Sequence, residues 1–353
     1  MKVGLTYDLR AEYLALGYDD QETAEFDRAD TIDAIEGALQ ALGHATERIG
    51  HVRDLTRQLA SGNRWDMVFN IAEGLRGFGR EAQVPALLEA YDIPYTFSDP
   101  LVMSLSLHKG HTKRVVRDAG VPTADFLVVE DGRQIGPPSF AAPYFVKPVA
   151  EGTGKGITPA SIIGRLEDLG PRCVELINAY RQPVLVEAFL PGREFTVGLI
   201  GTGADAAAIG TIEVHLRAAA EPLIYSYQNK ENCEELVEYG LVDAAGDAAV
   251  GEAEAIALQA WRVLGGRDAG RIDIRCDARG NPQFMEVNPL AGMHPAHSDL
   301  PIICGLIGMS YQTLIEKILA SACRRVTSER SKGDSGRIID FRSMAAGGSG
   351  LGC

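Results

Sequence analysis

Residues 271–288, RIDIRCDARGNPQFMEVN, alternate polar and apolar side chains on both sides of a turn sequence, and this pattern constrains the fold more than any other in the chain. Arg271 and Asp273 are two residues apart, as are Glu286 and Asn288, so each pair lies on one face of its strand. The DARGN segment between them favours a tight connection. With the register centred on that turn, we expect a β-hairpin in which Asp273 faces Glu286 and Arg271 faces Asn288.

The predicted hairpin gathers two carboxylates, an amide and a guanidinium in one cluster. Carboxylates that face each other across two strands repel unless a cation lies between them. Mg²⁺ suits Asp273 and Glu286 because it takes a few carboxylate oxygens and completes its shell with phosphates and water. Asn288 can add a carbonyl oxygen, and Arg271 can stabilise negative charge beside the metal. The alternative is a solvated hairpin face with salt bridges. The choice between this face and a metal site therefore depends on the other motifs.

Two lysines and a glycine-rich segment indicate a phosphate site. Lys147 ends the apolar strand pattern FVKP, and GTGKG follows at 152–156, where glycines let backbone N–H groups approach phosphate oxygens. The spacing matches neither a Walker A loop nor a dinucleotide fingerprint. Alone, GTGKG is also typical of a plain turn, and Lys109, a second candidate phosphate ligand, is also typical of a solvated helix surface.

The segment VLVEAFLPGRE, residues 184–194, indicates an adenosine site more directly. An apolar strand ends at Glu187, a short linker follows, and Glu194 begins the next strand. The linker can offer backbone groups to an adenine edge, Glu187 can accept from the exocyclic amine, and Glu194 can hold ribose hydroxyls. The alternative is a crossover between domains whose acids face water.

The first hundred residues alternate between strand and helix patterns. Strand patterns at 2–9, 65–71 and 93–96 flank helical patterns at 31–42 and 81–91, which predicts a parallel α/β sheet. The middle of the chain has the pattern of a smaller α+β unit, and strand patterns dominate afterwards. The expected units are an N-terminal α/β substrate domain at 1–98, a central lid domain at 99–185, a catalytic domain at 186–323 and a flexible tail at 324–353.

The formal net charge of −14 argues against one class of partner. Phosphate-backbone binding requires clustered Lys and Arg, and no basic stripe stands out, so we expect neither nucleic acid nor a membrane surface as a partner. The six cysteines are scattered without a CxxC pair, which is typical of a reduced, cytoplasmic protein. We expect no signal peptide and no transmembrane helix, because no apolar segment has the required pattern or length.

In their order, the motifs resemble the D-alanine–D-alanine ligase branch of the ATP-grasp enzymes. The resemblance runs over residues 65–320 through Lys109, FVKP, the glycine segment, VLVEAFLPGREFTV, YSYQNK, RIDIR and MEVN, and is most specific in its second half. It implies an ATP-grasp fold of class α/β (α+β), with an N-terminal parallel α/β domain, a small central α+β domain and a C-terminal domain on a mainly antiparallel sheet.

The resemblance also implies roles for individual residues. Arg271 would stabilise the tetrahedral intermediate together with the backbone near Gly292, and Lys230 would reach the transferred phosphate from a mobile loop. The implied ligands of two Mg²⁺ ions, with Mn²⁺ as the alternative metal, are Asp273, Glu286 and Asn288. The implied ATP-binding residues are Lys109, Lys147, Glu151, Gly152, Thr153, Gly154, Gly156, Glu187, Ala188, Phe189, Leu190 and Glu194.

The chemistry of the family is attack of a carboxylate on the γ-phosphate of ATP, followed by attack of an amine on the acyl phosphate, with release of ADP and phosphate. This chemistry depends on positioning and charge neutralisation and needs no protein nucleophile. The expected partners are ATP and small amino acid-like substrates, and the expected assembly is a homodimer. The alternatives are the same chemistry on a different amino acid-like acid in specialised metabolism and, more remotely, a nucleotide-binding protein without catalysis.

Departures from the family concern the two substrates. Glu73 stands where the family commonly has histidine, although Glu81 is retained. The segment after Asn288 is one residue longer than the family pattern, and it places Asp299, next to the matching Ser298, where leucine is usual. An acid at that position changes what the second pocket accepts. The expected substrate residues are Glu73, Glu81, Tyr227, His294, Ser298 and Asp299.

Overall fold

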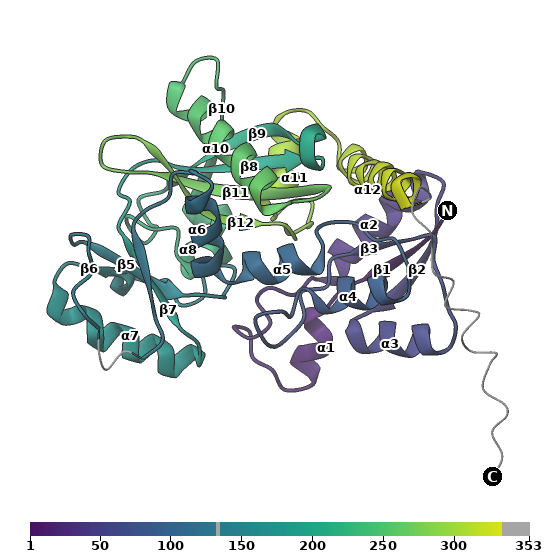
Figure 1. Ribbon diagram of the computed structural model, residues 1–353, viewed down its shortest axis with the longest axis horizontal. Helices are drawn as coiled ribbons and strands as arrows, with labels where there is room; N and C mark the ends of the chain where they lie inside the picture. Colours follow the sequence, from purple (N-terminus) through teal and green to yellow (C-terminus); the bar gives the residue numbers. More distant parts are fainter. Residues whose placement is uncertain (132–134, 334–353) are drawn as a thin grey trace, which may run out of the picture.

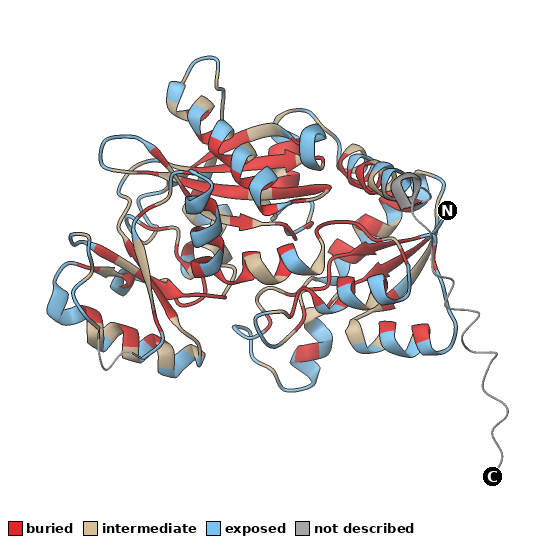
Figure 2. Ribbon diagram, viewed as in Figure 1, coloured by how far each residue is buried: buried red, intermediate tan, exposed pale blue. Residues whose placement is uncertain are grey.

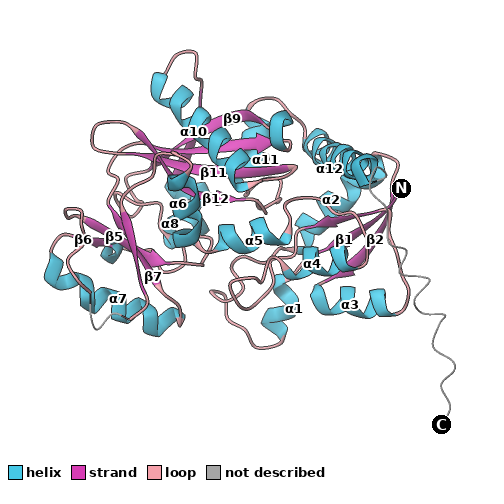
Figure 3. Cartoon of the chain, viewed as in Figure 1, coloured by secondary structure: helices cyan, strands magenta, loops and turns pink. Residues whose placement is uncertain are grey.

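The computed structural model describes residues 1–131 and 135–333, and this part of the chain contains three β-sheets (Figure 1). The strand orders are β2-β1-β3, β4-β7-β5-β6 and β10-β9-β8-β11-β12. The N-terminal sheet and the central sheet lie on opposite sides of the molecule, with the C-terminal sheet between and above them (Figure 3). Each sheet buries apolar side chains against helices, so buried residues follow the strands (Figure 2).

The N-terminal sheet is parallel, as predicted, with Val3 paired to Thr46 on one side and to Met67 on the other. The segment predicted as a strand at 93–96 forms only an isolated bridge between Tyr95 and Val68. The strand β2 and the helix after it were not predicted. The elements of this unit are β1 Lys2–Thr6, α1 Arg10–Ala15, α2 Ala29–Ala41, β2 Ala45–Gly50, α3 Val52–Ala60, β3 Met67–Asn70 and α4 Gln83–Ala90.

The central sheet is antiparallel and carries one long helix. The predicted boundary at residue 185 falls inside β7, which pairs with β4 and β5, so this sheet extends to Ala188. The helices α5 and α6 fall in the predicted central unit, but they also contact α10 or β12 of the C-terminal unit. The elements are α5 Pro100–Leu107, α6 Lys109–Asp118, β4 Phe126–Val129, β5 Tyr144–Pro148, η1 Pro159–Ser161, β6 Ile162–Ile163, α7 Leu166–Tyr180 and β7 Val184–Ala188.

The C-terminal sheet contains the predicted hairpin as β11 and β12. The register is confirmed: Asp273 pairs with Glu286 and Arg271 pairs with Asn288, and a bulge follows Asp273. The elements of this unit are β8 Glu194–Ile200, η2 Gly203–Asp205, β9 Ala207–Leu216, α8 Tyr227–Glu231, α9 Cys233–Leu236, β10 Val237–Val242, α10 Ala248–Leu264, β11 Ala269–Cys276, β12 Pro282–Asn288 and α11 Asp299–Leu306.

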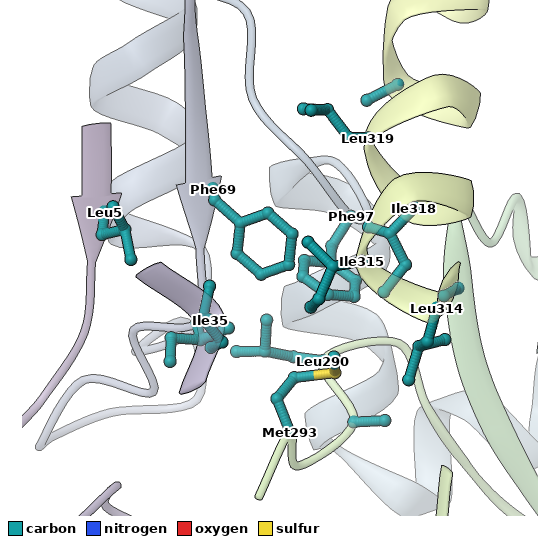
Figure 4. Close-up of a cluster of buried hydrophobic side chains, with 14 of the residues drawn as sticks. Leu5, Ile35, Phe69, Phe97, Leu290, Met293, Leu314, Ile315, Ile318 and Leu319 are labelled. Carbon is teal, nitrogen blue, oxygen red and sulfur yellow. The ribbon is translucent and has the colours of Figure 1, made fainter. Parts of the chain in front are cut away.

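The last helix of the described residues, α12 (Tyr311–Gly333), returns to the N-terminal unit and packs against α2. Its apolar side chains meet Phe69 and Phe97 in one buried cluster (Figure 4). The helix runs beyond the predicted start of the tail at residue 324, and residues 334–353 lie outside the described part. Among the described helices, none can span a membrane alone by length and composition; α11 and α12 meet that test only as a pair bent by 115°.

Candidate active site

The three units enclose a cavity of about 470 Å³, within the usual range of ligand pockets. Its walls come from the loop before α2, the ends of α5 and α6, the glycine segment, the segment 225–235, β12 and the loop 289–299. A smaller cavity of about 40 Å³ shares Lys109, Tyr225, Lys230 and Glu286 with it. The smaller cavity has room for only a few water molecules, so the surrounding loops have to separate before a nucleoside can enter.

The hairpin contributes its four predicted side chains to one buried cluster. Thr196 on β8 donates to Asp273 Oδ1 at 3.1 Å, and the guanidinium of Arg271 contacts the other Asp273 oxygen. Arg271 Nε also lies 3.3 Å from Asp299 Oδ2. Burial opposes the charge of Arg271, but the two aspartates outweigh it and raise the pKa of the guanidinium. Arg271 is therefore a fixed positive charge beside the predicted metal ligands.

Three lysines surround the carboxylates behind the hairpin. Glu286 Oε2 lies 3.6 Å from Lys109 Nζ and 3.8 Å from Lys147 Nζ. The two oxygens of Glu187 lie 2.6 Å from Lys113 Nζ and 3.2 Å from Lys147 Nζ. Burial favours neutral acids, but the lysines outweigh it and lower the pKa of both glutamates. Three ammonium groups against two carboxylates leave a positive surplus where phosphates were predicted.

The predicted metal ligands have the chemistry that Mg²⁺ prefers. No three histidine, cysteine, aspartate or glutamate side chains cluster as a metal site anywhere in the described residues. The hairpin instead offers two carboxylates and one amide, and Mg²⁺ commonly takes its remaining ligands from phosphates and water. In one orientation of its amide, the Asn288 oxygen accepts from Arg271 Nη2 at 3.0 Å. Asp273, Glu286 and Asn288 therefore fit a magnesium site that is completed by a nucleotide.

The glycine segment has the backbone of an anion-binding loop and lies against the segment that carries Lys230. Thr153, Gly154 and Gly156 all have positive φ angles, of 47°, 74° and 80°. Thr153 Oγ1 is buried without a hydrogen-bond partner in the described residues. A Cβ atom on Gly154 would lie 3.0 Å from the backbone nitrogen of Tyr227. Lys230 lies on the same segment as Tyr227, and its Nζ lies 4.8 Å from the centre of the Tyr225 ring.

The linker after β7 leads to Glu194, which lines the smaller cavity together with Phe145. Phe189 stacks on Phe145 with ring centres 6.3 Å apart, and Glu194 Oε2 lies 3.0 Å from Arg275 Nη1. The backbone N–H groups of Ala188 and Phe189 donate to other carbonyls. The neighbouring Leu190 N–H has no acceptor among the described residues, which leaves it available to the edge of a base. Glu151, the remaining predicted ATP ligand, accepts from Lys109 Nζ through its backbone oxygen at 2.7 Å.

The predicted substrate residues line the larger cavity, except one. Glu73, Glu81, His294, Ser298 and Asp299 all lie on its wall. Tyr227, the first residue of α8, does not; Tyr225, two residues earlier in the loop before α8, lines both cavities.

The loop around Gly292 is fixed by Ser298. Its Oγ accepts from the backbone N–H of His294 at 3.0 Å. A Cβ atom at Gly292 would lie 2.7 Å from the same oxygen, so a larger residue does not fit without a shift. His294 and His297 lie near the carboxylates of Asp30 and Glu234, at 3.4 and 3.2 Å.

Sequence reasoning missed two groups of charged residues. The first is Glu25, whose carboxylate lies 2.9 Å from Arg80 and 3.3 Å from Lys155 and accepts from the Gly152 N–H at 2.5 Å. It ties the acidic loop before α2 to the glycine segment. The second is Lys113, whose position four residues after Lys109 on one helix face was the available signal.

Comparisons with known proteins identify a family that matches most of the chain. The family model D-ala D-ala ligase C-terminus matches residues 115–320. A D-alanine–D-alanine ligase of Bordetella avium is 33% identical over 288 residues, which are 80% of this chain and 86% of the relative. Uncharacterized protein y4sG of Sinorhizobium fredii is 30% identical over 307 residues, which are 83% and 87%.

The solved structures that resemble the chain agree on the fold. The crystal structure of D-alanine–D-alanine ligase from Bacillus anthracis complexed with ATP has a TM-score of 0.71, at 20% identity, over 93% of this chain and 99% of that chain. A second crystal structure of the same enzyme has a TM-score of 0.72 at 19% identity. These likenesses confirm the expected fold class.

Proposed function

Because the chain belongs to the D-alanine–D-alanine ligase family of ATP-grasp enzymes, we propose that it uses ATP to join the carboxylate of one amino acid to the amine of another. It is a peptide-bond-forming ligase that consumes ATP. The observation that carries the site assignment is the register of β11 and β12, which sets Asp273 opposite Glu286 and Arg271 opposite Asn288, all four lining one or both of the two cavities.

The reaction has two transfers. A substrate carboxylate oxygen attacks the γ-phosphorus of ATP, the bond to the bridging oxygen breaks, and ADP leaves. The free amine then attacks the acyl carbon, the C–O bond to phosphate breaks, and the amine nitrogen loses a proton as the amide forms. Both steps concentrate negative charge on oxygen, so the protein accelerates them mainly by placing fixed positive charge.

Each residue has a role that follows from its position in the site. Lys109 and Lys147 neutralise the phosphates. Both ammonium groups lie beside Glu286, one of the proposed magnesium ligands, in the buried cluster. Lys230 approaches the transferred phosphate from α8. Arg271, with backbone N–H groups near Gly292, stabilises the oxyanion of the tetrahedral intermediate. Mg²⁺ held by the hairpin ligands, when bound, supplies further charge neutralisation at the phosphate oxygens.

The comparisons name D-alanine–D-alanine ligases and do not favour the alternative functions. Glu73 and Asp299, which line the larger cavity, differ from the family pattern on the substrate side of the site. We further propose a homodimer, on the resemblance alone; light scattering coupled to size-exclusion chromatography tests it.

Product analysis tests the function. With an accepted acid and amine, the purified chain should release ADP and phosphate in equal amounts to the amide, whereas AMP and pyrophosphate would indicate an adenylating ligase and contradict the proposal. Asp273→Ala and Glu286→Ala should each lower ATP turnover by at least about 100-fold, since even outer partners of metal ligands are worth about 10- to 100-fold. Glu252→Ala, on the exposed face of α10, is the matched control. Retained turnover in both variants would refute the metal site.

A further inference from the structure

One wall of the larger cavity carries carboxylates without partners. Asp27 before α2, Glu73 after β3 and Glu81 before α4 all line it. Among the described residues, none of the three carboxylates has a hydrogen-bond or ion-pair partner. Glu81 is only 8% exposed, and it is a charged side chain that is more than nine-tenths buried and borders the cavity. A buried carboxylate without a partner is costly, so this wall is arranged for a ligand.

The cations nearby make no ion pair with these acids, because they lie against other carboxylates. Arg80 lies 2.9 Å from Glu25, and Lys109 lies 3.6 Å from Glu286. Arg10 and Arg28, which also line the cavity, lie 3.2 and 2.8 Å from Asp20 and Asp30. Of the lysines and arginines that line this cavity, only Lys230 lacks a carboxylate within 4 Å in the described residues, and it belongs to the proposed phosphate side.

Another wall of the cavity has the complementary chemistry. Arg271, Asn288 and the backbone at Gly292 lie there, with Lys109 and Lys230 beside them. A carboxylate that is to be phosphorylated fits that wall, where positive charge is fixed. A molecule with a carboxylate at one end and ammonium groups at the other would therefore match both walls at once.

We propose that the acid substrate of this ligase is a basic amino acid, a molecule with a second ammonium or guanidinium group besides its α-amine, and that Asp27, Glu73 and Glu81 select it. This inference rests on the proposed ligase function. A single α-amine can pair with one or two of these carboxylates; three carboxylates in one wall match a ligand with two cationic groups.

The pKa values of these three acids agree with this arrangement. Burial is the main cause that raises the pKa of all three acids, to about 8 for Asp27 and about 7 for Glu81. Neighbouring acids add to it: Asp8 acts on Asp27, and Glu81, Glu25 and Asp27 act on Glu73. The charge of Arg80 opposes the shift for both glutamates, and that of Lys109 opposes it for Glu81. A bound cation would favour the ionised forms of these groups.

The test compares matched acids. ADP release by the full chain with MgATP is measured for the D- and L-forms of lysine, ornithine and arginine, and for norleucine and alanine, singly and in pairs. Because an ionic hydrogen bond contributes about 1.5–3 kcal/mol, kcat/KM for the best basic acid should exceed that for norleucine by about 10- to 100-fold. Calorimetric binding of the same acids gives a readout that does not depend on turnover.

Variants assign the preference to this wall. Asp27→Asn, Glu73→Gln and Glu81→Gln should each lower the ratio of basic to neutral acid by about tenfold or more. Glu12→Gln, an exposed acid on α1 that does not line the cavity, is the matched control. At pH 8 each variant should melt at or above the wild-type temperature, since an amide replaces a buried acid whose ionisation is unfavourable, so loss of the fold is recognised separately.

The outcomes separate the two proposals. If norleucine or alanine is used and bound as well as the basic acids, or if the three variants keep the ratio of the Glu12→Gln control, the inference is wrong and the ligase function stands. If no pair of acid and amine releases ADP and no acid binds, both proposals are wrong. A basic acid that binds tightly without ADP release contradicts only the assignment of the reaction.

Discussion

At the scale of single residues, the interior holds two kinds of charge with opposite consequences. Lys113 and Glu187 are both buried but satisfied, because each lies within 2.6 Å of the other. Asp27 is partly buried and has no such partner among the described residues. The attraction within a buried pair offsets part of its desolvation cost, whereas an unpaired acid remains neutral until something ionises it. The first kind stabilises the proposed phosphate side of the site, and the second leaves a carboxylate with which a ligand can pair.

The unpaired acid makes stability depend on pH. In the unfolded chain Asp27 titrates near about 3.9, whereas burial and Asp8 raise its folded pKa to about 8. Between these values the folded protein holds a proton that the unfolded chain has lost, so this stabilisation is complete below about pH 4 and is lost as the pH rises towards 8. Asp27→Asn cannot titrate, and its melting temperature relative to wild type should rise from pH 5 to 8 in scanning calorimetry.

The matched control for this pH series is Glu12→Gln, since Glu12 is exposed on α1. Its melting temperature relative to wild type should stay flat over the same range. A constant difference for Asp27→Asn as well would show that Asp27 is ionised at neutral pH in the folded protein.

Asp299, in the pocket expected for the second substrate, contacts Arg271. Its carboxylate lies 3.3 Å from Arg271 Nε and, after burial, raises the pKa of the Tyr225 and Tyr239 hydroxyl groups. Asp299→Leu removes an anion that repels an acceptor carboxylate, and like charges held together cost several kcal/mol. We expect kcat/KM for D-alanine relative to alaninamide to rise by at least about tenfold, with a smaller change in KM for ATP. An unchanged amine profile would remove Asp299 from the second pocket.

At the scale of elements, the glycine segment lies against α8, and under the proposed function the two act as covers over the nucleotide. Gly154→Ala places a Cβ atom 3.0 Å from the Tyr227 nitrogen at a φ of 74°. Strain of about 1–2 kcal/mol in this left-handed region should raise KM for ATP by about 5- to 30-fold, because the covers no longer close. Gly164→Ala, which meets no atom within 4 Å, should keep the wild-type KM. Equal values in initial-rate measurements would show that the covers do not close on ATP.

The hairpin could be predicted from the sequence, because its residues are close together along the chain. The cavity wall formed by Asp27, Glu73 and Glu81 could not, because its residues are far apart. The strand period and the turn sequence are local, and they gave the correct register of Asp273 with Glu286. Asp27, Glu73 and Glu81 come from three segments whose approach depends on how the N-terminal sheet packs. The strand at 93–96 was wrong because one bridge between Tyr95 and Val68 does not extend into a ladder.

At the scale of the whole molecule, Asp268 joins separate parts of the chain. It is fully buried, and it accepts from the Phe97 N–H at 2.9 Å and from Arg325 Nη2 on α12 at 2.9 Å. Arg325→Met would leave this carboxylate without its main counter-charge and should lower the free energy of unfolding by about 3–5 kcal/mol in urea titrations. Arg324→Met, an exposed neighbour, should change it by less than about 0.5 kcal/mol. Equal effects would mean that α12 is not anchored through Arg325.

The return of α12 to the first sheet has a consequence for biosynthesis. Leu314, Ile315 and Ile318 supply one side of the core that contains Phe69 and Phe97 (Figure 4). Translation produces the two phenylalanines more than two hundred codons before these partners. A nascent chain on the ribosome therefore keeps an uncovered apolar face until α12 emerges, and ribosome-associated chaperones have that whole interval in which to bind it.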